Sequence, residues 1–239
     1  WMARFNLEKA LWARDWLLEN DPRQFTELSA RIGLFEEELR HWEMVARQLF
    51  VPVPGPDGVI EQFEGFFELA DVGIEVSDRI RAPVNRLLDW RRINRSRICK
   101  QADVLMLPFL FPEEFSVEVT RANYDYYEPL TDHGSSLSLP VHACIAARIG
   151  RRDEALAYYS QAVELDLFNL MENTSLGVHA ACMAGSWQAL VFGFLGVRLT
   201  ERGPLVASPV SPAMPKEWGN VRCRLEFRGV THEWEVSAA

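Results

Sequence analysis

The sequence predicts a mainly α-helical protein that ends in a small antiparallel β-sheet. Three observations support this fold class: apolar residues recur at helical spacing over most of the first 198 residues, prolines cluster over 204–215, and apolar and polar residues alternate strictly within 221–228 and 232–236. The chain has 239 residues and is 48% hydrophobic. It is therefore long enough to bury a sizeable core.

The first fifty residues predict three helices. The first covers 5–20 and carries apolar residues on two faces, which is typical of a helix covered on both sides. Asp21-Pro22 provides an N-cap and a first-turn proline for the second helix, which extends to about residue 31. The third covers 36–49 and begins with acidic residues, which favour a helix N-terminus.

The middle of the chain predicts a long connection followed by further helices. A proline-rich loop at 51–58 cannot be helical, and 59–98 has weak periodicity, so we expect short helices in an irregular segment. Helical patterning returns in four segments, at 113–127, 138–149, 153–165 and 177–197. Helices paired through short loops are typical of an α/α toroid or an α-solenoid. A solenoid requires a repeat, and a step of about 34 residues from 154–166 does not reproduce its pattern in either direction.

The composition changes after Arg198, where we place a domain boundary between 1–198 and 199–239. Two alternating segments, 221–228 and 232–236, are separated by Gly229 and predict a β-hairpin. A few strands are not stable alone. The hairpin is therefore expected to belong to a sheet that packs on the helices.

Charge and cysteine content exclude several classes of protein. The formal net charge of −9 disfavours nucleic acid and acidic membrane surfaces as partners. The four cysteines are far apart and form no metal-ligand spacing, so we predict reduced, buried thiols, no metal, and a cytoplasmic protein. No apolar run approaches the roughly 20 residues of a membrane span, and the N-terminus does not resemble a signal peptide.

One candidate anion site is the segment 131–138. It contains His133, Gly134, Ser135 and Ser136 directly before a predicted helix. Glycine lets the backbone curl, and exposed N–H groups at a helix start bind anions. Taken alone, the segment favours an ordinary serine-rich helix cap.

A second candidate is Lys100-Gln101, which places a cationic donor beside an amide that can grip sugar hydroxyls. Alone, this pair favours a surface lysine at a helix start. The stretch from Arg79 to Lys100 contains eight basic residues and one acid, Asp89. Such a stretch raises the local concentration of an anionic substrate. The alternative interpretation is a solvated face that balances acidic neighbours.

No spacing identifies a catalytic pair among the candidate acids, and we expect surface or capping roles for most of them: Glu113, Glu114, Glu118, Glu128 and Asp132. His142 and His179 lie in apolar helical stretches. Hydrogen-bonded core imidazoles are therefore expected at both positions.

Four motifs in order, at 100–104, 123–129, 131–138 and 177–187, resemble the maltose, trehalose and kojibiose phosphorylases of glycoside hydrolase family 65. Shorter matches at 62–67, 173–174 and 193–196 extend the resemblance over nearly the whole chain. Members of that family have an N-terminal β-sandwich, a helical linker, a catalytic (α/α)6 barrel and a small C-terminal β-sheet domain. The resemblance therefore implies that 1–198 is the later part of the (α/α)6 barrel and that 199–239 belongs to the C-terminal sheet domain.

The family reaction is the inverting cleavage of an α-glucosidic disaccharide by inorganic phosphate, which gives β-glucose 1-phosphate and a free sugar. By motif, Lys100 and Gln101 are expected to bind the glucosyl unit. His133, Ser135 and Ser136, with the backbone of Gly134, are expected to hold phosphate. No cofactor is expected beyond phosphate as co-substrate, and a homodimer is left open because family members commonly dimerise.

The family's general acid is a glutamate, and residues 2–6 resemble the segment just downstream of it. The acid is therefore expected upstream of Trp1, and we predict that the chain alone does not turn substrate over. Two alternatives remain: a hydrolase of the same family, in which a carboxylate base replaces part of the phosphate site, and a noncatalytic α-helical interaction module.

Overall fold

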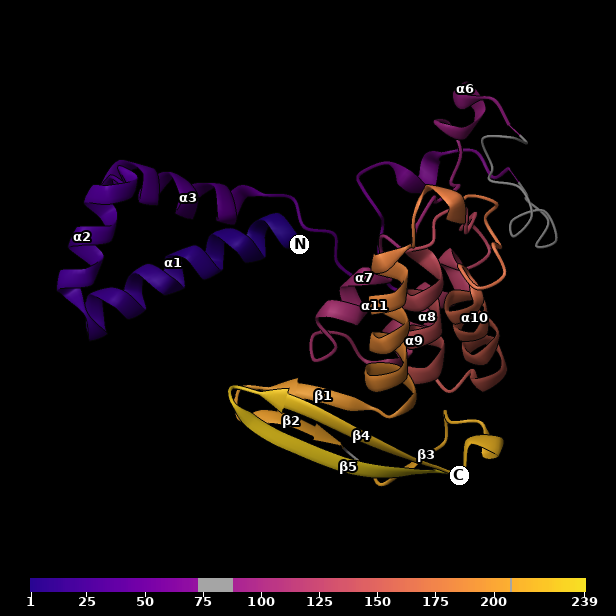
Figure 1. Ribbon diagram of the computed structural model, residues 1–239. Helices are drawn as coiled ribbons and strands as arrows, with labels where there is room; N and C mark the ends of the chain where they lie inside the picture. The colour runs from indigo at the N-terminus through magenta and orange to yellow at the C-terminus, as the bar shows by residue number, and fades with distance from the viewer. Residues whose placement is uncertain (73–87, 207) are drawn as a thin grey trace. The chain divides into compact units, whose positions relative to one another are not determined.

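A computed structural model describes residues 1–72, 88–206 and 208–239 (Figure 1). The protein is mainly helical and ends in β-strands, which confirms the predicted order of elements. The chain divides into two compact units, 1–53 and 54–239. Each unit is described by itself.

The N-terminal unit contains the three predicted helices, α1 (Met2–Asn20), α2 (Pro22–Ile32) and α3 (Glu36–Gln48). The Asp21 carboxylate caps α2 by accepting the Gln24 N–H, as the Asp21-Pro22 pair predicts. Within this unit α1 packs against both α2 and α3. Trp12 and Trp16 on α1 nevertheless stay 60% and 49% exposed. The second apolar face predicted for this helix is therefore not covered within the unit.

The second unit begins with an irregular segment, as expected from its weak periodicity. Its short helices are η1 (Phe66–Glu68), α6 (Trp90–Ile93) and α7 (Met106–Leu110). The buried Asn123 side chain fixes this segment by accepting the Ile60 N–H at 2.8 Å and donating to the Gly58 carbonyl at 2.9 Å.

The predicted basic stretch is only partly described. Arg79, Arg81 and Arg86 lie outside the described residues. Arg91 and Arg92, which follow, are exposed on α6.

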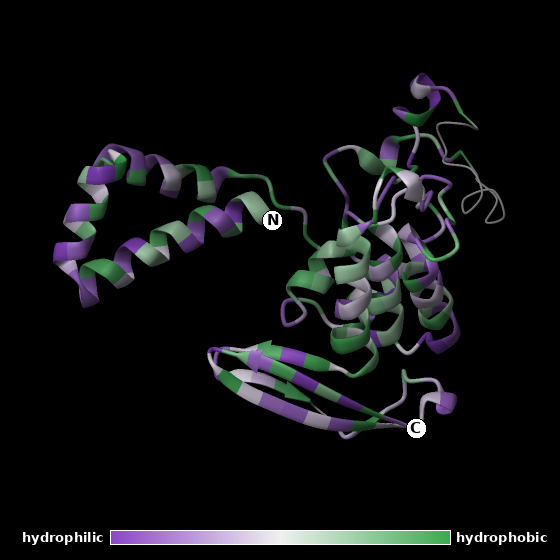
Figure 2. Cartoon of the chain, in the orientation of Figure 1, coloured by the Kyte–Doolittle hydropathy of each residue, from purple (hydrophilic) through white to green (hydrophobic). Residues whose placement is uncertain are grey.

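Four helices form the body of this unit: α8 (Val117–Tyr127), α9 (Ser138–Arg148), α10 (Arg152–Glu164) and α11 (Ala180–Gln188). Helix α9 is central, because it packs against α7, α8, α10 and α11. It is buried from Ser138 to Ala147 except at the partly buried Val141, and hydrophobic colours dominate it and α11 in Figure 2. The chain leaves α9 through Gly150, whose φ of 83° matches the predicted C-terminal cap.

The last predicted helix differs from expectation. A 3-10 turn, η2 (Thr174–Leu176), precedes α11, which continues as a π-helix, η3 (Ala189–Phe194). A Cβ atom on Gly193 would lie 2.9 Å from the Cα of Cys144, so only glycine allows η3 to approach α9 this closely. Side-chain periodicity alone does not distinguish a π-turn from an α-turn over so few residues.

The C-terminal strands form two small sheets. Strands β1 (Val197–Thr200) and β2 (Gly203–Val206) pair antiparallel. In the second sheet β5 (Val230–Ala238) lies between β4 (Asn220–Phe227) and β3 (Val210–Ser211).

The β4–β5 pair confirms the predicted hairpin. Cys223 faces Trp234 across it, and the two strands alternate in hydropathy in Figure 2. The short β3–β5 pair is parallel, which the alternation did not predict. Residues 212–219, including η4 (Lys216–Trp218), connect β3 to β4, and these two strands lie on opposite sides of β5.

One apolar cluster joins the second sheet to the helices, as expected. Met214, Cys223 and Val236 share it with Ile145 and Phe194. All four cysteines are free and buried, as predicted. The predicted domain boundary at 198/199 stays a prediction.

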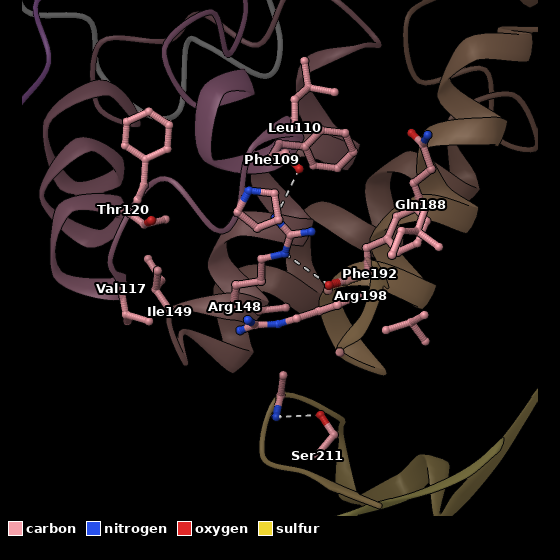
Figure 3. A pocket seen from close by; sticks show the side chains of 18 of the residues that line it. Phe109, Leu110, Val117, Thr120, Arg148, Ile149, Gln188, Phe192, Arg198 and Ser211 are labelled. Atoms are coloured by element: carbon pink, nitrogen blue, oxygen red, sulfur yellow. Dashed lines mark hydrogen bonds between the residues drawn. The ribbon is translucent and has the colours of Figure 1, made fainter. Parts of the chain in front are cut away.

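Beside this cluster lies a cavity of about 480 Å³ at the C-terminal end of α9 (Figure 3). The Arg148 guanidinium crosses it and donates to the carbonyls of Pro108 and Phe192 at 2.9 and 3.2 Å. Arg148 therefore joins α7 and η3 to α9.

Candidate functional site

The two predicted binding segments lie side by side. The Cys99 N–H donates to the Leu130 carbonyl at 2.8 Å, and the Asp132 N–H donates to the Cys99 carbonyl at 2.9 Å. This short parallel pairing places Lys100 and Gln101 next to the segment that begins at His133. The sequence predicted both segments separately, and the backbone brings them together.

The loop that follows curls into the N-terminus of α9. His133 has a φ of 51°, and the Gly134 N–H turns back to the Asp132 carboxylate at 2.6 Å. Across the described ranges, no acceptor receives the backbone N–H of Ser135 or Ser136. These two residues are partly exposed and carry hydroxyls as well. The loop therefore presents several donors at a helix N-terminus, where an anion is favoured.

The His133 ring points inward, away from solvent. The residue is 5% exposed, its Nδ1 lies 2.9 Å from the Ser138 hydroxyl, and its Nε2 lies 3.1 Å from the Tyr158 hydroxyl. Tyr158 in turn donates to the Glu128 carboxylate at 2.6 Å. His142 is also buried, with its Nδ1 3.0 Å from the Ser138 carbonyl, which confirms the expected core imidazole.

The sugar side of the candidate site is more open. Lys100 is exposed, whereas Gln101 is partly buried and lines a cavity of about 260 Å³. Leu137 from the loop and Ala181 and Gln188 from α11 line the same cavity. Its volume is below the roughly 300–1,000 Å³ of drug-sized ligand sites, so it suits a single small unit.

The segment around Gln62 borders this site. Its side-chain amide donates to the Asp103 carboxylate at 3.1 Å and accepts the Cys99 thiol at 3.0 Å. Burial raises the pKa of Asp103, and burial with the nearby Asp103 and Asp132 carboxylates raises the pKa of Cys99 to about 12. Cys99 is therefore a protonated structural thiol.

Two further groups, Tyr158 and the Asp166–His179 pair, were not predicted as site residues. Tyr158 joins the loop from α10, a contact between distant positions that no local pattern reveals. Asp166 accepts the His179 ring Nδ1–H at 2.6 Å and the His179 N–H at 2.8 Å, which lowers the pKa of Asp166. The one sequence signal for the Asp166–His179 pair was the position of His179 inside the 177–187 motif.

Two negative findings apply only to the part of the chain that the structure describes. No cluster of three or more His, Cys, Asp or Glu side chains suited to a metal is present there. No helix there has the length and apolar character of a membrane span.

Residues 1–188 match the family model for the glycosyl hydrolase family 65 central catalytic domain. The chain belongs to glycoside hydrolase family 65. It is 33% identical over 236 residues to a kojibiose phosphorylase of Halothermothrix orenii, covering 99% of this chain and 30% of that protein. It is also 33% identical over 231 residues to an α,α-trehalose phosphorylase of Thermoanaerobacter brockii, covering 96% of this chain and 29% of that protein.

The fold agrees with a solved family 65 relative. A human-microbiome protein assigned as a kojibiose phosphorylase superposes with a TM-score of 0.83 and 29% identity, over 98% of this chain and 34% of that one. This match is consistent with part of an (α/α)6 barrel followed by a small C-terminal sheet, as the resemblance implied. The chain spans about three tenths of the length of the curated relatives it matches.

Proposed function

We propose that this chain forms the glucose- and phosphate-binding part of an inverting disaccharide phosphorylase. The observation that carries the proposal is the loop at the N-terminus of α9, where Ser135 and Ser136 present N–H groups and hydroxyls beside Lys100 and Gln101. A phosphorylase needs an anion site at the position where an inverting hydrolase needs a carboxylate base. The names of the relatives, kojibiose and trehalose phosphorylase, agree with this chemistry.

In the proposed reaction a phosphate oxygen attacks the anomeric carbon of the glucosyl unit from the face opposite the leaving sugar. The new C–O bond forms as the glycosidic C–O bond breaks, and the general acid gives its proton to the departing oxygen. The product is β-glucose 1-phosphate, with inversion. Donors aimed at phosphate fix its position and balance its charge, which are the two contributions that such a site can make.

Five of the six predicted site residues have a direct role in this proposal. Lys100 and Gln101 bind the glucosyl hydroxyls, and the cavity beside Gln101 receives that unit. Ser135 and Ser136 bind phosphate, and the bend at Gly134 orients them. The general acid comes from a segment that precedes Trp1, and phosphate is the only co-substrate. We also propose a cytoplasmic enzyme, with a homodimer as one open oligomeric state.

The hydrolase alternative requires a carboxylate that activates water at the loop. The two nearest candidates are both engaged within the protein: Glu128 accepts the Tyr158 hydroxyl, and Asp132 accepts the Gly134 N–H and is 3% exposed. These contacts favour the phosphorylase over the hydrolase.

The test compares the 239-residue chain with the same chain extended upstream to include the general acid. Kojibiose, trehalose and maltose are supplied with and without inorganic phosphate, and products are followed by NMR. We expect β-glucose 1-phosphate from the extended protein only, and only with phosphate. Equal cleavage in phosphate-free buffer would establish the hydrolase instead, and turnover by the 239-residue chain would contradict the upstream acid.

A further inference from the structure

We propose that His133 holds the phosphate loop in its binding shape through buried hydrogen bonds and that its imidazole does not contact phosphate. This inference rests on the proposed phosphate site, and it assigns His133 a positioning role in place of direct binding. Three features of the described structure carry it: the partners of the ring, the packing around it, and the backbone conformation of the residue.

Both ring nitrogens are directed at protein groups. Nδ1 lies 2.9 Å from the hydroxyl of Ser138, the first residue of α9, and Nε2 lies 3.1 Å from the hydroxyl of Tyr158 on α10. The His133 side chain is only 3% exposed. A phosphate contact would require the ring to leave both partners and turn toward solvent.

The proton positions follow from the Tyr158 contacts. Tyr158 gives its hydroxyl proton to Glu128 at 2.6 Å, so the His133 Nε2 donates to the Tyr158 oxygen. In the neutral ring Nδ1 then accepts the Ser138 hydroxyl proton. The same contacts connect the C-terminal end of α8, the start of α9 and the middle of α10 through one imidazole.

Aromatic packing restricts the ring further. The His142 ring lies at a centroid distance of 4.5 Å and an angle of 74°, and the Tyr158 ring lies at 5.0 Å. His133 is thus held between side chains of two helices. This packing opposes rotation of the ring away from Ser138 and Tyr158.

The backbone shows what this orientation achieves. A φ of 51° is unfavourable for a residue with a side chain, and the buried contacts of the ring offset that cost. The turn at His133 directs the Gly134 N–H back to Asp132, and the donors of Ser135 and Ser136 follow on the outer side. Removal of the ring contacts is therefore expected to loosen the donors without removing any of them.

The experiment titrates inorganic phosphate into the complete 239-residue chain and follows two sets of NMR signals. We expect the amide signals of Ser135 and Ser136 to shift, while the signals of the His133 ring nitrogens stay as they are without phosphate. Protonation of the ring, or a change of tautomer as phosphate saturates, would overturn the positioning role. Absence of phosphate binding in the wild-type chain would remove the proposed function itself, and this inference with it.

Variants separate the two roles by phosphate affinity. Tyr158→Phe removes a ring partner but no proposed phosphate donor, and we expect the phosphate Kd to rise about tenfold, which corresponds to about 1.4 kcal/mol. The matched control is Tyr159→Phe, whose ring packs on Phe194 and Trp218 instead. We expect no change in its Kd.

His133→Asn provides the second variant, because asparagine tolerates a positive φ. We expect it to bind phosphate more tightly than His133→Ala, since it retains the turn. An unchanged Kd in Tyr158→Phe, together with complete loss in His133→Asn, would show direct contact by the imidazole and overturn the inference while leaving the proposed function intact. Thermal unfolding of each variant identifies any that fails to fold.

Discussion

The two ends of α9 are held in contrasting ways. At its N-terminus buried polar side chains, Ser138, His142 and His133, are joined by hydrogen bonds. At its C-terminus Ala147 and Ile149 belong to an apolar cluster with the C-terminal sheet. Beside that cluster lies the cavity of about 480 Å³, which the Arg148 guanidinium crosses. The apolar C-terminal end therefore anchors α9 to the sheet, and the polar N-terminal end presents hydrogen-bond donors in a defined geometry.

The largest effect is expected at the polar end, in catalysis. In the extended protein, combined Ser135→Ala and Ser136→Ala substitutions remove two donors from the proposed phosphate site. Loss of one such donor typically lowers kcat by about 10²–10³-fold, so we expect kcat/KM for phosphate to fall at least a hundredfold. The control is Ser175→Ala, an exposed serine in η2. Equal activity in the double variant and in the control would show that phosphate binds elsewhere.

At the apolar end the largest effect is expected in stability. Phe194 is fully buried and packs on Tyr159 and Trp218 at centroid distances of 5.3 and 5.1 Å. Phe194→Ala should lower the free energy of unfolding by about 3–5 kcal/mol, measured by denaturant titration. Phosphate affinity below the unfolding transition should stay the same, because Tyr159 and Trp218, on which Phe194 packs, are not part of the proposed phosphate site. A parallel loss of affinity would show that the two ends are not independent.

A smaller loss of stability is expected from crowding of the π-helix. Gly193→Ala places a Cβ atom 2.9 Å from the backbone of Cys144, and such overpacking costs about 1–3 kcal/mol. The control is Gly150→Asn, where no atom lies within 4 Å and asparagine tolerates the φ of 83°. Denaturant titration should therefore give a lower free energy of unfolding for Gly193→Ala than for Gly150→Asn. Equal stability would mean that η3 shifts away from α9 at little cost.

The smallest effect concerns pH and the start of α11. Hydrogen bonds from His179 lower the pKa of Asp166, so this carboxylate stabilises the folded state above its unfolded pKa, and the contribution is lost as pH falls through the folded pKa. Asp166→Asn should therefore lower the Tm at pH 7, and the deficit should disappear in acid. Glu164→Gln, an exposed change on α10, is the control. A deficit of equal size at low pH would show that packing, not charge, is lost.

The sequence predicted the apolar end of α9 better than the polar end. Alternation over 221–236 predicted the β4–β5 hairpin, because period-two burial is a local property of each strand. Helical periodicity likewise predicted α1, α2, α3 and α9 closely. The π-turn at η3 could not be predicted, because it depends on the tight approach of Gly193 to Cys144.

At the polar end the sequence identified the segments but not their contacts. The motifs pointed to Lys100, Gln101 and the loop from His133 to Ser136, and the Cys99–Thr131 bridge places these segments together. The inward turn of the His133 ring and its contact with Tyr158 depend on the packing of α10, 25 residues further along the chain. Such contacts join distant positions, and only the folded structure reveals them.

The central claim is that the loop before α9 binds phosphate, and a crystal of the chain soaked with inorganic phosphate tests it most directly. We predict one phosphate within about 2.7–3.2 Å of the Ser135 and Ser136 N–H groups, beside Lys100, with the His133 ring still bonded to Ser138 and Tyr158. A saturated crystal in which this loop stays empty, or in which phosphate binds only at another place, would contradict the account.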